Sequence, residues 1–74
     1  MTTAADAIRE AMNALGGEAD ARDVRAWVEE RYPGRWSDIT VAMADLTYPG
    51  NASSTYPVGE RFLERVNRGR YRLR

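Results

Sequence analysis

Apolar side chains recur every three or four residues in three segments of the chain, which is the period of an amphipathic helix. The pattern predicts helices over residues 3–15, 21–32 and 37–47. Their expected buried positions are Ile8, Ala11, Met12 and Leu15 in the first, Val24, Trp27, Val28 and Tyr32 in the second, and Ile39, Ala42, Met43 and Leu46 in the third.

Polar residues and glycines mark the ends of these segments. Thr3 and Asp6 have the spacing of a capping box at the start of the first helix, and Gly16 and Gly17 end it. Serine is a good N-cap because its hydroxyl accepts a hydrogen bond from the first turn, so Ser37 is the expected N-cap of the third helix.

Apolar residues and arginines alternate on both sides of the Arg68-Gly69 pair near the end of the chain. Alternation with a period of two is typical of β-strands, and glycine supplies the positive φ that a two-residue hairpin turn needs. The sequence therefore predicts a hairpin over residues 61–74. One face is expected to carry Phe62, Val66, Tyr71 and Leu73, and the cationic face Arg65, Arg70, Arg72 and Arg74.

Three helices followed by a β-hairpin form the outline of a winged helix-turn-helix, an α+β fold. Residues 48–60 are rich in proline, glycine and serine and are predicted to be a polar loop between the third helix and the hairpin wing. A chain of 74 residues suffices for one small apolar core. We therefore expect a single winged-helix domain over residues 1–74.

The composition narrows the chemistry that is open to the chain. Cysteine and histidine are absent, so disulfides, thiol or histidine catalysis and an ordinary zinc site are not expected. No pair of acids sits in an evident pocket, and the chain has no long apolar run or export signal. The expected protein is a cytoplasmic monomer that binds no metal, cofactor or membrane and is not an enzyme.

The net charge of zero hides a strong segregation of charge along the chain. Residues 1–56 contain five arginines and nine acids, a net charge of −4, whereas residues 57–74 contain six arginines and two acids, a net charge of +4. All 11 basic residues are arginines. The planar guanidinium of arginine fits phosphates and guanine edges, which favours contact with nucleic acid. Coding bias in a GC-rich genome is an alternative explanation for the use of arginine in place of lysine.

Several stretches of the chain resemble a known group of DNA-binding domains. They are the run from Gly16 to Val41, then Asn51 and Tyr56-Pro57, and the run from Phe62 to Leu73. They are similar to winged-helix domains of prokaryotic restriction and mobile-element proteins, in particular the C-terminal domain of DpnI-type N6-methyladenine-dependent restriction endonucleases. The resemblance implies a specificity module that binds double-stranded, adenine-methylated DNA beside a nuclease or other catalytic domain.

In such a fold the third helix enters the major groove, and the hairpin lies along the backbone or an adjacent minor groove. Asp38 is placed to accept a hydrogen bond from a base amino group, and Val41 to contact a thymine methyl or N6-methyl group. The polar and cationic candidates would hold phosphates. The full set of expected DNA-binding residues is Arg35, Trp36, Ser37, Asp38, Thr40, Val41, Asn51, Ser53, Ser54, Tyr56, Arg65, Arg68, Arg70 and Arg72.

Each candidate also has a purely structural explanation. Asp38 favours the start of a helix through the macrodipole, an isolated surface valine such as Val41 is common, and Trp36 can complete the core. The polar residues of the loop are ordinary turn formers, and the arginines of the hairpin suit a solvated face.

A second class of function stays open beside DNA binding. The third helix contains no arginine, and Asp38 and Asp45 on its outward face would repel phosphates. A winged helix with such a surface can instead bind a protein through its acidic helices and an edge strand. The salt dependence of binding separates the two classes, because neutralising phosphates releases counterions.

Overall fold

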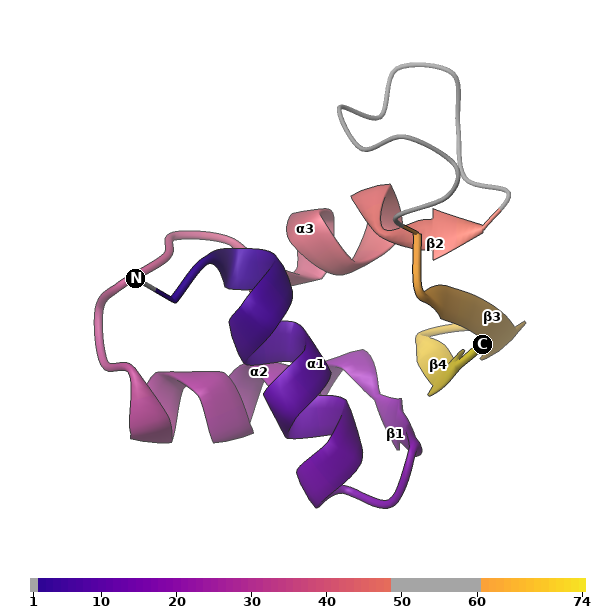
Figure 1. Ribbon diagram of the computed structural model, residues 1–74, viewed down its shortest axis with the longest axis horizontal. Helices are drawn as coiled ribbons and strands as arrows, with labels where there is room; N and C mark the ends of the chain where they lie inside the picture. Colours follow the sequence, from indigo (N-terminus) through magenta and orange to yellow (C-terminus); the bar gives the residue numbers. More distant parts are fainter. Residues whose placement is uncertain (1, 49–60) are drawn as a thin grey trace.

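The computed structural model describes residues 2–48 and 61–74, which form three helices and a four-stranded sheet (Figure 1). The predicted α+β class is confirmed. In chain order the elements are α1 (Ala4–Ala14), β1 (Glu18–Asp20), α2 (Ala21–Arg31), α3 (Ile39–Asp45), β2 (Thr47–Tyr48), β3 (Leu63–Asn67) and β4 (Arg70–Leu73).

The sheet has the strand order β1-β4-β3-β2. β3 and β4 form an antiparallel hairpin, β1 pairs antiparallel with β4, and β2 pairs parallel with β3. Figure 1 shows the hairpin on one side of the three helices, with β1 and β2 at its two edges. The sequence did not predict β1 or β2, because strands of three and two residues carry no measurable alternation of their own.

The predicted capping box of α1 is confirmed. The backbone N–H of Asp6 donates to the Thr3 hydroxyl at 3.1 Å, and the backbone N–H of Thr3 donates to the Asp6 carboxylate at 3.2 Å. Gly16 and Gly17 end the helix with φ values of 92° and 89°. The prediction that Leu15 belongs to the buried stripe is wrong. Leu15 lies in the turn after the helix and is 36% exposed.

The capping hydrogen bonds predict an effect of pH on stability. The backbone N–H of Thr3 and then its hydroxyl hold the pKa of Asp6 below its ordinary value of 3.8. The carboxylate therefore stabilises the fold fully above about pH 4, and this contribution is lost as the pH falls through the lower folded-state pKa. In thermal unfolding between about pH 2 and 6, Asp6→Asn is expected to have a flatter acid limb than the wild type. An acid limb as steep as that of the wild type would contradict this role of the Asp6 carboxylate.

The third helix begins later and ends earlier than the sequence predicted. Asp38, not Ser37, is its N-cap, and the Asp38 carboxylate accepts a hydrogen bond from the Val41 N–H at 3.2 Å. At the other end the Leu63 N–H donates to the Leu46 carbonyl at 3.2 Å, so the chain turns into β2 instead of continuing the helix to Thr47.

The core lies where the three helices meet the sheet. Trp27, Tyr32 and Ala42, which were expected to be buried, are only half-buried and pack against the core from its rim. Its largest fully buried side chains are Ile8, Met12, Val24, Val28, Met43, Leu46 and Leu63. Among the described residues no buried side-chain nitrogen or oxygen lacks a hydrogen-bond partner.

The hairpin turn is confirmed, but the facing predicted for its first strand is wrong. Gly69 has a φ of 73° in the turn. Leu63 lies opposite Leu73 and is fully buried, whereas Val66, expected on the apolar face, is 43% exposed. The strand begins at Leu63, and an irregularity in the register between Arg65 and Asn67 breaks the alternation around Val66.

Two other residues of the hairpin, Arg65 and Phe62, also lie elsewhere than the sequence predicted. Arg65 lies directly opposite Tyr71, so it shares the core-side face with Tyr71 instead of the cationic face. Phe62 precedes the strand and packs half-buried against the core. The alternation therefore located the hairpin correctly but assigned the two faces of its first strand the wrong way round.

Candidate nucleic-acid interface

The outward surface of α3 consists of short, uncharged side chains. Thr40, Val41 and Ala44 are exposed, and the expected outward position of Val41 is confirmed by its 56% exposure. Asp38 caps the helix, which matches its structural explanation, and Asp45 is half-buried. The middle of this surface therefore has no charge that would repel a phosphate backbone.

An arginine stacked on aromatic rings precedes the N-terminal end of α3. The Arg35 guanidinium lies 5.0 Å from the ring centroid of Trp36 and 6.0 Å from that of Tyr32, and it donates to the Thr2 carbonyl at 3.2 Å. Trp36 is half-buried, with its ring in edge contact with Tyr32 at 5.6 Å. Trp36 thus packs against the core and also supports Arg35.

A second arginine is stacked on an aromatic ring just after the C-terminal end of α3. The Arg74 guanidinium lies 3.8 Å from the ring centroid of Tyr48 and donates to the Arg61 carbonyl at 2.9 Å. Tyr48, the last residue of β2, is 41% exposed. Neither Tyr48 nor Arg74 was among the expected binding residues. Nothing local in the sequence indicates their contact, because it depends on the pairing of β2 with β3 and of β3 with β4.

Arg35 and Arg74 are alike in that neither guanidinium is neutralised by a carboxylate of the described residues. A guanidinium stacked on a ring keeps N–H groups free at its edge. α3 has seven residues and is therefore about 10 Å long, so two oriented cations flank a short helix whose exposed middle residues, Thr40, Val41 and Ala44, carry no charge.

The arginines of β4 have carboxylate partners instead. Arg70 donates through Nε to Glu18 at 2.7 Å and through a terminal nitrogen to Asp20 at 3.1 Å, and Arg72 donates to Glu64 at 2.5 Å. The hydrogen bond to Glu18, followed by that to Asp20, raises the pKa of Arg70 above its ordinary value. These five side chains define the outer face of the sheet, and their two positive and three negative charges sum to −1, so this face is not cationic as predicted.

The other predicted residues of the hairpin and loop lie elsewhere. Arg65 and Arg68 are exposed near the hairpin turn and form no salt bridge in the described part of the chain. The turn contacts the start of α2, where the Ala21 N–H donates to the Gly69 carbonyl at 2.8 Å. The hairpin joins α3 at its opposite end, through Leu63, so the structure does not gather these arginines with Arg35. The predicted loop residues Asn51, Ser53, Ser54 and Tyr56 lie outside the described residues.

A comparison with known families assigns this chain to one of them. Residues 4–73 match the family described as "Domain of unknown function (DUF7669)". The chain belongs to the DUF7669 family. No curated protein and no solved structure matches it.

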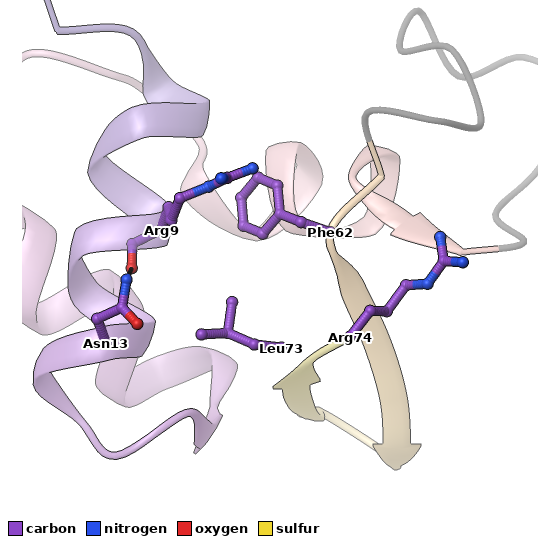
Figure 2. Close-up of a pocket in the computed structure, with 5 residues that line it drawn as sticks. All are labelled: Arg9, Asn13, Phe62, Leu73 and Arg74. Carbon is purple, nitrogen blue, oxygen red and sulfur yellow. Dashed lines mark hydrogen bonds between the residues drawn. The ribbon is translucent and has the colours of Figure 1, made fainter.

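The DUF7669 domain also has a shallow groove of about 210 Å³ between α1 and the base of the hairpin. Figure 2 shows the Arg9 guanidinium against the Phe62 ring, 4.4 Å from its centroid, and Leu73 pointing toward α1. Asn13 donates to the Arg9 carbonyl at 3.1 Å, while the Arg74 side chain points away from α1. This groove is the place where α1 supports the hairpin that carries Arg74.

Over the described ranges, no three histidine, cysteine, aspartate or glutamate side chains come together in a group that could hold a metal ion. None of the described helices of the DUF7669 domain has the length and apolar character needed to cross a membrane.

Proposed function

We propose that the DUF7669 domain is a winged helix that binds double-stranded DNA, with α3 in the major groove and Arg35 and Arg74 on the flanking phosphates. The observation that carries the proposal is the pair of aromatic-stacked arginines at the two ends of α3. Neither cation has a carboxylate partner among the described residues, so each is available to a phosphate.

The order of the elements supports the winged-helix part of the proposal. α2 and α3 follow each other as in a helix-turn-helix, and β1 precedes them. The strand order β1-β4-β3 places this first strand beside the hairpin that follows α3, as in winged helices. In helix-turn-helix proteins the second helix of the pair lies in the major groove, which makes α3 the DNA-contacting helix.

The dimensions of α3 support the same placement. The major groove is about 12 Å wide, and a helix of seven residues is about 10 Å long. Cations at both ends of such a helix can reach the backbones on the two sides of the groove. The short side chains of Thr40, Val41 and Ala44 allow the helix to approach the base edges closely.

The proposal includes a specificity role for the domain. The resemblance to the DpnI type points to N6-methyladenine, whose methyl group lies in the major groove, where Val41 offers an exposed apolar contact. On this view the domain is a non-catalytic module that acts beside a nuclease or other catalytic domain.

Fluorescence anisotropy with labelled duplexes at increasing salt tests the proposal. The duplexes carry adenine or N6-methyladenine in GATC and scrambled contexts. With two phosphate contacts, the slope of log K against log salt is expected to be about −2, and tighter binding of the methylated duplex supports the specificity role. Absence of binding to every duplex at about 50 mM salt overturns the proposal.

Protein binding is the second candidate, and one observation favours it. Because Arg70 and Arg72 are paired with three carboxylates, the outer face of the sheet has no net positive charge to attract a polyanion. Val41 and Tyr48 add exposed apolar surface. A partner held mainly by apolar contacts would bind with little dependence on salt, in contrast to DNA.

A further inference from the structure

We infer that α3 recognises the 5-methyl group of pyrimidines in the major groove, chiefly that of thymine, through Val41. This inference rests on the proposed function, because it requires α3 to lie in that groove. It assigns the chemistry of base recognition to a single exposed apolar side chain and its neighbours.

The residues of α3 exclude the usual contacts to purines. Arginine and lysine recognise guanine, and asparagine and glutamine recognise adenine, through paired hydrogen bonds to base edges. The helix sequence Ile-Thr-Val-Ala-Met-Ala-Asp contains none of these four residue types. Thr40 has a hydroxyl, but a hydroxyl both donates and accepts and therefore discriminates poorly between bases.

The exposed surface of α3 is instead suited to methyl groups. Val41 is 56% exposed, and Ala44, three residues later, is its neighbour on the helix surface and is also exposed. Thr40 adds a further methyl group four residues before Ala44. These groups form an apolar strip on the outward side of α3, flanked by Arg35 and Arg74. Phosphate contacts at the two ends of the helix would position α3 so that this strip faces the base edges.

The C5 methyl group of thymine is the apolar feature of unmodified base pairs in the major groove. Uracil lacks this methyl group but keeps the same hydrogen-bonding groups. 5-Methylcytosine carries a methyl group at the same ring position on a different base. A helix that recognises the methyl group is therefore expected to prefer thymine over uracil and 5-methylcytosine over cytosine.

Four 24-base-pair duplexes test the inference by anisotropy at one low salt concentration: alternating A-T, alternating A-U, alternating G-C and alternating G-5-methylcytosine. Burying one methyl group corresponds to about a fourfold change in affinity. The wild-type domain should bind each methylated duplex about fourfold more tightly than its unmethylated counterpart. Equal affinities within both pairs overturn the inference while leaving the proposed function intact, and binding to none of the four overturns both.

Two matched variants assign the preference to α3. Val41→Ser removes the apolar contact at little cost to the helix, because serine and valine have similar helix propensities. Val66→Ser changes an exposed valine of similar accessibility in the hairpin. The methyl preference should disappear in Val41→Ser and persist in Val66→Ser. Its persistence in Val41→Ser would show that Val41 does not carry the methyl preference and would overturn the inference.

Discussion

Leu63→Ala is expected to lower the free energy of unfolding by about 2–5 kcal/mol, whereas Val66→Ala should change it by no more than about 0.5 kcal/mol. Leu63 is fully buried in the core, and truncating it removes apolar contacts and leaves a cavity. Val66 is 43% exposed on the same strand, so its truncation exposes little new surface and leaves no void.

Urea denaturation followed by tryptophan fluorescence measures this difference, because Trp27 and Trp36 are half-buried against the core. Small domains are stable by only about 5–15 kcal/mol, so Leu63→Ala is expected to lose a large fraction of the free energy of unfolding and to unfold at a much lower urea concentration. A larger loss in Val66→Ala than in Leu63→Ala would restore the facing that the alternation of the sequence predicted and contradict the register of the hairpin.

Arg35→Ala combined with Arg74→Ala is expected to weaken binding to duplex DNA by about 10- to 100-fold at 50 mM salt. Each lost phosphate contact removes about 0.9 from the slope of log K against log salt, so the double variant should lower that slope by about 1.8. Anisotropy titrations at several salt concentrations give both quantities. Because the contacts are to phosphates, the loss should be the same for every duplex sequence.

The matched control is Arg70→Ala combined with Arg72→Ala, which removes the same number of positive charges from β4. Both arginines are paired with carboxylates, so their loss also frees Glu18, Asp20 and Glu64. A general effect of net charge would weaken binding in both double variants to the same extent. The proposal requires the salt slope to fall in the Arg35 and Arg74 variant and to stay near the wild-type value in the control.

The parts of the fold that depend on neighbours in the sequence could be predicted. The capping box of Thr3 and Asp6 and the positive φ of Gly69 involve residues within one turn of each other. The inward positions of Ile8, Val24 and Met43 follow from the helical period. The facing of β3 was missed because a strand of five residues with an irregular register has too short a pattern to set its phase.

The candidate site was predicted less completely, because its charges depend on residues that are far apart in the chain. The sequence pointed to Arg35, Trp36 and the exposed surface around Val41, which lie in one continuous segment. It missed Tyr48 and Arg74, since their stacking requires two strand pairings. It also treated Arg70 as a free cation, although a strand 52 residues earlier supplies Glu18 to neutralise it.

The amino-acid sequence by itself determined three helices, the capping box of α1, one hairpin turn and the outward position of Val41, because each is set by contacts within a few residues. Only the tertiary structure decided which arginines keep their charge available. The pairing of β1 with β4 brings two acids beside Arg70, while the pairing of β2 with β3 places Tyr48 under Arg74. An arginine takes the partner that folding brings within hydrogen-bonding distance, and in this domain those partners come from distant strands.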